Sequence, residues 1–141
     1  MISLDKIMTR DVVTVRRTAD IYDAIRMMSD GNITGLPVVD DDEKLVGIVT
    51  EKDVMRRLLN TRNTEGKVQD YMTGDVISFN VNDNLVDVIN TLVENNFRRV
   101  PVESEGKLVG IISRRDIISY LFSLELKDRG ILTTAVRGRF S

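Results

Sequence analysis

The chain has 141 residues, of which 42% are hydrophobic and 30% charged, a composition typical of a compact folded protein. Lys and Arg number 20 against 22 Asp and Glu, and this near balance argues against electrostatic capture of nucleic acid or an anionic membrane. Without Cys or His there are no disulfides, no imidazole base and no usual zinc ligands, so we expect neither a metal site nor hydrolase chemistry. We find no membrane-spanning apolar run or signal peptide and therefore expect a cytoplasmic protein.

The N-terminal half predicts a strand, a helix and a hairpin in that order. A β-branched run at 12–15 is typical of a strand. Apolar residues from Ile21 to Met28 recur at helical spacing, and Gly31 is placed to end that helix. Apolar segments at 36–39 and 45–49 flank an acidic turn, which predicts a β-hairpin.

A further helix should begin near Thr50, and a polar linker follows it. The whole pattern then returns, so that Pro37 and Pro101 of two matching apolar-Pro-Val steps lie 64 residues apart. Such repetition predicts two β-α-β-β-α units, each needing the other to complete its core. The last helix should extend through Ser119–Lys127 and end at Gly130, and the β-prone run at 131–136 should pack on the module or a second subunit.

Two motifs recur at matching positions in the repeats. They are the apolar-Pro-Val steps Leu36-Pro37-Val38 and Val100-Pro101-Val102, and the sequences Gly47-x-x-Thr50-x-x-Asp53 and Gly110-x-x-Ser113-x-x-Asp116. Together with the order of elements, they resemble the CBS domain of cystathionine β-synthase-like proteins, a stand-alone tandem pair of which is called a Bateman module.

The resemblance implies an α+β (mixed α/β) fold in which two tandem CBS repeats pack through their sheets with pseudo-twofold symmetry. It divides the chain into repeat 1 at 1–60, a linker at 61–68, repeat 2 at 69–121 and a C-terminal extension at 122–141. It also implies a regulatory module, with no required cofactor, that binds AMP, ADP, ATP or S-adenosylmethionine between the repeats. We expect a homodimer, and an unidentified protein would be regulated.

The Gly-x-x-Thr/Ser-x-x-Asp motif suits ribose recognition. Thr50 and Ser113 fall at strand-to-helix junctions, where a hydroxyl lies near the positive end of a helix and near any bound phosphate. Asp53 and Asp116 fall in the first helical turn and are ribose candidates, while the motif glycine would let a ligand approach the backbone. The alternative is that the hydroxyls are ordinary N-caps and the carboxylates only complement the helix dipole.

Phosphate recognition is predicted mainly in the second repeat, which is the more basic. The resemblance implies Arg98 and Arg99 as phosphate candidates, and Arg114 follows Ser113 with a third guanidinium that can bind phosphate oxygens. Alternatively, the Arg98–Arg99 pair forms a solvated face that pairs with acids such as Glu94 or Glu103.

The adenine slot is assigned to the two apolar-Pro steps. Leu36, Pro37, Val100 and Pro101 could supply an apolar surface with backbone groups beside it, although extended core strands have the same pattern.

Two function hypotheses remain from the sequence: an adenosyl-ligand sensor, and a non-enzymatic dimerising adaptor with empty clefts. We do not expect an enzyme, since no nucleophile has a base beside it.

Overall fold

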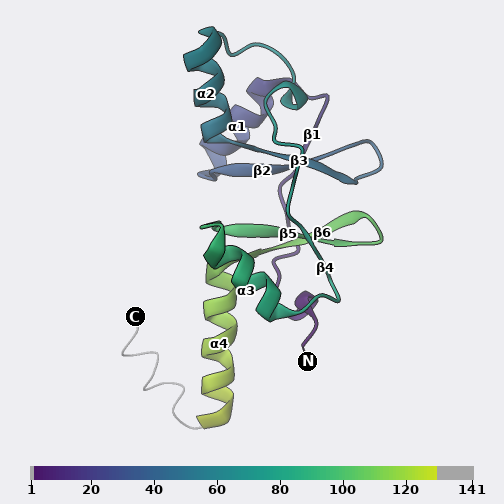
Figure 1. The fold of residues 1–141 in the computed structure, drawn as a ribbon, viewed down its shortest axis with the longest axis vertical. Helices are drawn as coiled ribbons and strands as arrows, with labels where there is room; N and C mark the ends of the chain where they lie inside the picture. The colour runs from purple at the N-terminus through teal and green to yellow at the C-terminus, as the bar shows by residue number, and fades with distance from the viewer. Residues whose placement is uncertain (1, 130–141) are drawn as a thin grey trace.

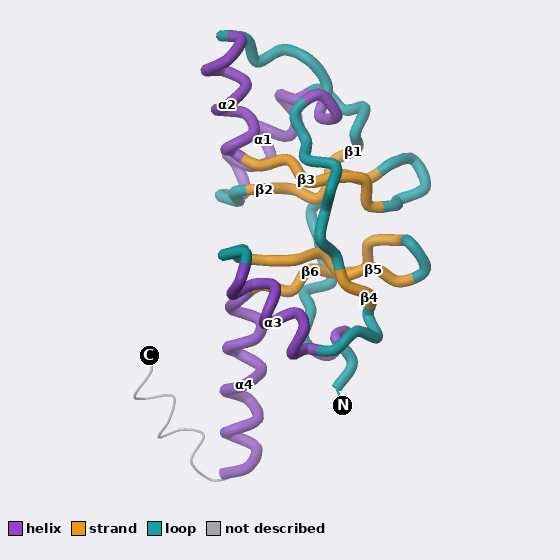
Figure 2. Tube along the Cα trace, in the orientation of Figure 1, coloured by secondary structure: helices purple, strands orange, loops and turns teal. Residues whose placement is uncertain are grey.

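Two small sheets face each other at the centre, and helices cover their outer sides (Figures 1 and 2). This computed structural model describes residues 2–129. The first repeat contains η1 (Leu4–Lys6), β1 (Val15–Arg16), α1 (Ile21–Gly31), β2 (Gly35–Val39), β3 (Leu45–Thr50) and α2 (Glu51–Thr61). The second contains η2 (Val68–Asp70), β4 (Phe79–Asn80), α3 (Leu85–Glu94), β5 (Arg99–Ser104), β6 (Lys107–Ser113) and α4 (Arg114–Arg129). The predicted mixed α/β class and the β-α-β-β-α order of both repeats are confirmed.

Each sheet has three strands in the same arrangement. The orders are β1-β2-β3 and β4-β5-β6, with a parallel first pair and an antiparallel hairpin. The strand predicted at 12–15 and its repeat counterpart 64 residues later, at 76–79, are wrong in extent, because β1 and β4 have only two residues each. The reason is that the chain before each of these strands crosses to the other repeat.

The crossing segments are residues 4–9 and 68–73, and they join the edge strands of the opposite repeats. Thr9 exchanges backbone hydrogen bonds of 2.8 and 2.9 Å with Ile111 of β6, and Thr73 exchanges bonds of 2.8 and 3.0 Å with Ile48 of β3. Each sheet is therefore extended by a segment that belongs, by sequence, to the other repeat.

The two hydrophobic cores are completed by the same exchange. Leu4, Ile7 and Met8 are buried in the core beneath α3 of the second repeat. Val68 and Tyr71 are buried in the core of the first repeat. Neither core is complete without the crossing segment of the other repeat, which agrees with the dependence inferred from the repetition.

The motif glycines make room for the crossing segments. A Cβ added to Gly47 would lie 2.7 Å from Met72 Sδ and 2.8 Å from the Thr73 carbonyl oxygen. At Gly110 it would lie 2.5 Å from Met8 Sδ. The expectation that these glycines admit a ligand is therefore corrected, because the protein's own chain occupies the space beside them.

The helix ends agree with the sequence patterns in most respects. Asp20 caps α1 by accepting a hydrogen bond of 2.8 Å from the Tyr22 amide. Gly31 is the last residue of α1, and Asn32 takes the left-handed conformation that follows it. The predicted extension of the last helix is confirmed as far as Arg129, while Gly130 and the β-prone run at 131–136 lie outside the described residues. Among the described helices, none has the length and apolar character needed to cross a bilayer.

Candidate functional site

The two sheets present matching inner faces to each other. Side chains alternate along a strand, so the neighbours of the core residues Leu36 and Val100 lie on the faces turned toward the opposite repeat. On the first sheet these are Gly35, Pro37, Ile48 and Thr50, and on the second they are Arg99, Pro101, Ile111 and Ser113. The motif hydroxyls and both prolines therefore belong to the surfaces between the repeats.

Asp53 forms a capping box with Thr50 at the start of α2. Its Oδ2 accepts hydrogen bonds from the Thr50 amide at 2.8 Å and from Thr50 Oγ1 at 3.0 Å. The Asp53 amide in turn donates to Thr50 Oγ1 at 3.3 Å. Oδ1 of Asp53 has no hydrogen bond within the described part of the chain, so one oxygen of this half-buried carboxylate is free to accept one.

Asp116 forms the equivalent capping box at the start of α4. Its Oδ2 accepts from the Ser113 amide at 2.8 Å, and its amide donates to Ser113 Oγ at 3.1 Å. Thr9 of the crossing segment also donates to this carboxylate, with Oγ1 3.2 Å from Oδ1 and 3.4 Å from Oδ2. Both oxygens of Asp116 are thus engaged, and the two motif carboxylates are not equivalent.

The alternative prediction that Thr50 and Ser113 act as N-caps is therefore confirmed, and this role is compatible with ligand binding. A cap fixes the carboxylate at the end of the edge strand, beside the crossing segment. A ribose could use the free oxygen of Asp53 directly, whereas at Asp116 it would replace the hydroxyl of Thr9.

The three candidate phosphate-binding arginines have different environments. Arg99 lies on the inner face opposite Ser113 and is half-buried, whereas the Arg98 side chain is exposed. Arg114 turns back to its own repeat, where Nε donates to the Phe97 carbonyl at 2.7 Å and NH2 donates to Asn96 Oδ1 at 2.9 Å. Arg99 is the best placed for a ligand between the repeats, and Arg114 serves the turn before β5.

The proposed adenine-slot residues divide in the same way. The side chains of Leu36 and Val100 are each only 1% exposed and pack into the cores of their own repeats, so they line no slot. Pro37 and Pro101 are buried as well, but on the inner faces between the repeats.

Sequence reasoning missed Thr9 as a partner of Asp116. The two residues are 107 positions apart and meet only because the crossing segment lies on β6. The Met8-Thr9 step does return as Met72-Thr73 in the second repeat, but this recurrence does not indicate which strand either segment joins.

Two interlocked repeats with a capped carboxylate at each inner junction define a tandem-repeat module. The family model described as the CBS domain matches residues 4–60 and 68–123. The chain belongs to the CBS-domain family, which confirms the resemblance drawn from the motifs.

Relatives and solved structures of this family are similar to most of the chain. An uncharacterized protein of Methanocaldococcus jannaschii is 43% identical over 84% of the chain, which spans 42% of that protein. The chain spans 22% of the inosine-5'-monophosphate dehydrogenase of the same organism, at 37% identity over 81% of the chain. The chain thus covers less than half of each of these two curated relatives.

Two of the similar structures contain adenosine compounds. CBSX2 from Arabidopsis thaliana, solved in complex with AMP, has a TM-score of 0.76 and 28% identity, covering 89% of this chain and 99% of that one. The CBS domain pair of protein MJ0100 was solved with 5'-methylthioadenosine and S-adenosyl-L-methionine. It has a TM-score of 0.72 and 28% identity, covering 89% of this chain and 98% of that one.

Proposed function

We propose that this chain is a regulatory module that binds an adenosine-containing ligand, AMP, ADP, ATP or S-adenosylmethionine, between its repeats. The observation that carries the proposal is the fixed carboxylate of Asp53, whose free Oδ1 can accept from a ribose hydroxyl beside the inner face. The adenosine compounds bound by two similar CBS pairs support the same ligand class.

The charge of the inner face favours a phosphorylated ligand. Of the eight inner-face residues named above, Arg99 alone is charged, and its counterpart in the first repeat is Gly35. A guanidinium binds phosphate oxygens through parallel hydrogen bonds. Arg99 should therefore distinguish AMP from adenosine, and it provides a test of the phosphate position.

Regulation would follow if the ligand binds one arrangement of the repeats better than another. The crossing segments give a physical route, since ribose binding at Asp116 would compete with Thr9 and so act on the segment that closes the second core. The ligand would then change how tightly the repeats interlock.

We also propose that two copies associate through α2 and α4, which lie along the same side of the molecule (Figure 1). Large apolar side chains project from both helices with exposures of 40–81%. They are Met55, Leu58 and Leu59 of α2 and Ile118, Leu121 and Leu124 of α4. Large exposed apolar patches typically mark an interface. Leu59→Ser changes a side chain that is 81% exposed, so loss of dimer in analytical ultracentrifugation would not reflect loss of the core.

The decisive experiment is isothermal titration of the full chain with AMP, adenosine and S-adenosylmethionine, preceded by a thermal-unfolding screen. Ligand at about 100 times its Kd should stabilise the fold by about 2.7 kcal/mol. Asp53→Asn should weaken binding by about 1–2 kcal/mol, because the amide removes the charge from the hydrogen bond to ribose. Arg99→Ala should weaken AMP binding more than adenosine binding.

The matched control is Asp87→Asn, which removes the same charge from the first turn of α3, away from the inner faces. It should leave the affinity unchanged. If no adenosine compound binds, the module is an adaptor with empty clefts, and if Asp53→Asn and the Asp116→Asn variant both retain full affinity, the ribose assignment is wrong.

A further inference from the structure

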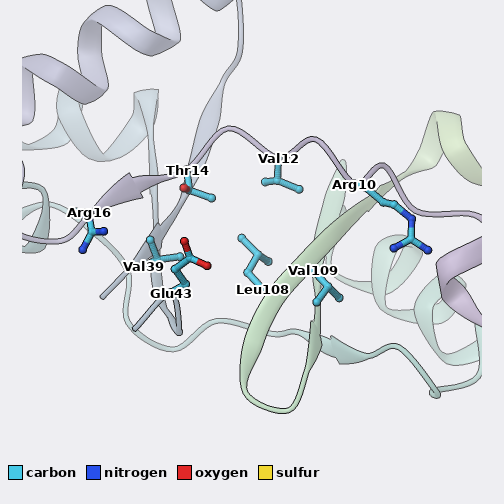
Figure 3. A pocket seen from close by; sticks show the side chains of 8 residues that line it. All are labelled: Arg10, Val12, Thr14, Arg16, Val39, Glu43, Leu108 and Val109. Atoms are coloured by element: carbon cyan, nitrogen blue, oxygen red, sulfur yellow. The ribbon is translucent and has the colours of Figure 1, made fainter. Parts of the chain in front are cut away.

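A cleft lies between the two hairpins and the chain that leads into β1. It is a half-open cleft with a volume of about 330 Å³, at the lower end of the range of about 300–1,000 Å³ typical of small-molecule sites. Its lining consists of Arg10, Val12, Thr14, Arg16, Val39, Glu43, Leu108 and Val109 (Figure 3).

The end of this hairpin-end cleft that contains Leu108 is separate from the capped carboxylates. Leu108 and Val109 lie at the start of β6, next to the turn, whereas Asp116 follows the far end of the same strand. The five residue steps of extended chain from Leu108 to Ser113 span about 17 Å. A nucleotide at Asp116 and a small ligand at Leu108 would therefore occupy different places.

The cleft is divided into a polar and an apolar part. Figure 3 shows Thr14 and Glu43 close together on one side, with the Glu43 carboxylate directed toward the interior, and Arg16 farther out, beyond Val39. Val12 and Leu108 extend toward each other beside them. This arrangement suits a compact molecule with an aliphatic body and a polar end.

The polar part carries both signs of charge. Glu43 and the hydroxyl of Thr14 can accept from an ammonium group, and the guanidinium of Arg16 can donate to a carboxylate. Arg16 forms an ion pair with Asp41, with Arg16 NH1 2.8 Å from Asp41 Oδ1, and both side chains are exposed. Exposed ion pairs contribute about 0–1 kcal/mol, so a ligand carboxylate can share or replace this contact at little cost.

The corresponding place in the second repeat has different chemistry. Glu103 stands where the first repeat has Val39, and its Oε2 accepts a hydrogen bond of 2.8 Å from Ser78 Oγ, the counterpart of Thr14. Asn80 replaces Arg16. The hydrogen bond between Ser78 and Glu103 joins β5 to the chain just before β4. At the corresponding place in the first repeat, the hairpin-end cleft is open.

We propose that the hairpin-end cleft binds a small aliphatic α-amino acid as a zwitterion. Its ammonium group binds Glu43 and Thr14, its carboxylate binds Arg16, and its side chain packs on Val12 and Leu108. The site does not depend on the adenosyl function, and it would give the module a second input.

The test is calorimetric titration of the full chain with leucine and with two analogues that each lack one charge. These are 4-methylpentanoate, without the ammonium, and 3-methylbutan-1-amine, without the carboxylate. Leucine should bind, and each analogue should bind at least about tenfold more weakly, the effect of losing one charged hydrogen bond. Absence of leucine binding at about 10 mM, or equal affinity for all three, would overturn the proposal.

Variants locate the site. Glu43→Gln and Arg16→Ala should each weaken leucine binding at least about tenfold. Arg10→Ala is the matched control, because Arg10 lies at the far end of the cleft, and it should change the affinity less than about threefold. Val39→Glu should rebuild the pair found in the second repeat, now with Thr14, and abolish leucine binding.

AMP titration of the same variants separates the two sites, since AMP affinity should be unchanged. Val39 is buried, whereas Glu43 is exposed. If the Val39→Glu variant fails to fold, the leucine affinity of Glu43→Gln decides the test. Unchanged leucine affinity in Glu43→Gln would refute the assignment of the ammonium.

Discussion

Adding one methyl group at Gly47 should test whether this motif glycine serves the packing of the crossing segment. The added Cβ would lie 2.7 Å from Met72 Sδ and 2.8 Å from the Thr73 carbonyl oxygen. The sulfur can move with its flexible side chain, but the carbonyl is held by its hydrogen bond of 3.0 Å from the Ile48 amide. Gly47→Ala must therefore displace the crossing segment from β3.

The expected cost follows from overpacking, which typically destabilises a fold by about 1–3 kcal/mol. Replacing glycine also reduces the entropy of the unfolded chain, which stabilises the folded state by about 0.4–1 kcal/mol. The net loss for Gly47→Ala should be about 1–2 kcal/mol. With a urea m-value of about 2 kcal/mol per M, the unfolding midpoint should fall by about 0.5–1 M.

Gly74→Ala is the matched control for this measurement. Gly74 follows the same crossing segment, but its added Cβ would meet nothing within 4 Å. This variant should be neutral or more stable by up to about 1 kcal/mol.

The Gly110→Ala variant adds a second check through its partner side chain. Its two shortest contacts, at 2.5 and 2.8 Å, are to Met8 Sδ and Cγ. Combining it with Met8→Ala should therefore cost less than the sum of the single changes. If Gly47→Ala keeps full stability and instead loses AMP affinity, the glycine serves ligand approach and the packing explanation is wrong.

Three further predictions concern the supports of the site. Thr50→Ala should lower the stability by about 0.5–2 kcal/mol in urea unfolding by removing the cap of α2, whereas Thr50→Ser should retain most of it. Arg57→Ala should cost about 1 kcal/mol in the same assay, because Arg57 lies 4.9 Å from the Tyr71 ring centroid and donates to a carbonyl of the crossing segment. The Lys44 amide donates to the Asp40 carboxylate and lowers the pKa of that group below 3.8. The stability that this hydrogen bond contributes is present above the ordinary pKa and is lost as the pH falls through the lowered pKa. Asp40→Asn should therefore be less stable than the native chain at pH 7, and this difference in the free energy of unfolding should disappear at acid pH. A difference that does not change with pH would contradict this explanation.

The difference between the two motif carboxylates bears directly on how many ligands the chain binds. Asp53 offers a free oxygen, whereas Asp116 already accepts from Thr9. We expect the Asp53 cleft to be the tighter one, because no internal hydrogen bond has to be exchanged there. Thr9→Val should raise the affinity of the second cleft relative to the first, and two-site titration would measure it.

Local sequence determined the repeat, the order of elements and the capped junctions. Helical spacing and β-branched runs report on burial within one element, and a hydroxyl followed by a carboxylate three residues later reports on a helix start. The predictions of α1, of both hairpins and of the starts of α2 and α4 needed nothing more. Thr50 and Ser113 are the clearest cases, since each cap is closed by an aspartate three residues away.

Only the tertiary structure decided which segments meet. Residues 4–9 and 68–73 have no periodicity that reveals their exchange between repeats, so the strands at 12–15 and 76–79 were overextended and Thr9 was missed. Because side chains alternate along a strand, those of Leu36 and Val100 pack into the cores and that of Arg99 lies on the inner face. Arg114 instead donates a hydrogen bond to the turn before β5. Contacts between distant residues depend on the register and path of the whole chain, and therefore the completed cores and the hairpin-end cleft form only when the two repeats interlock.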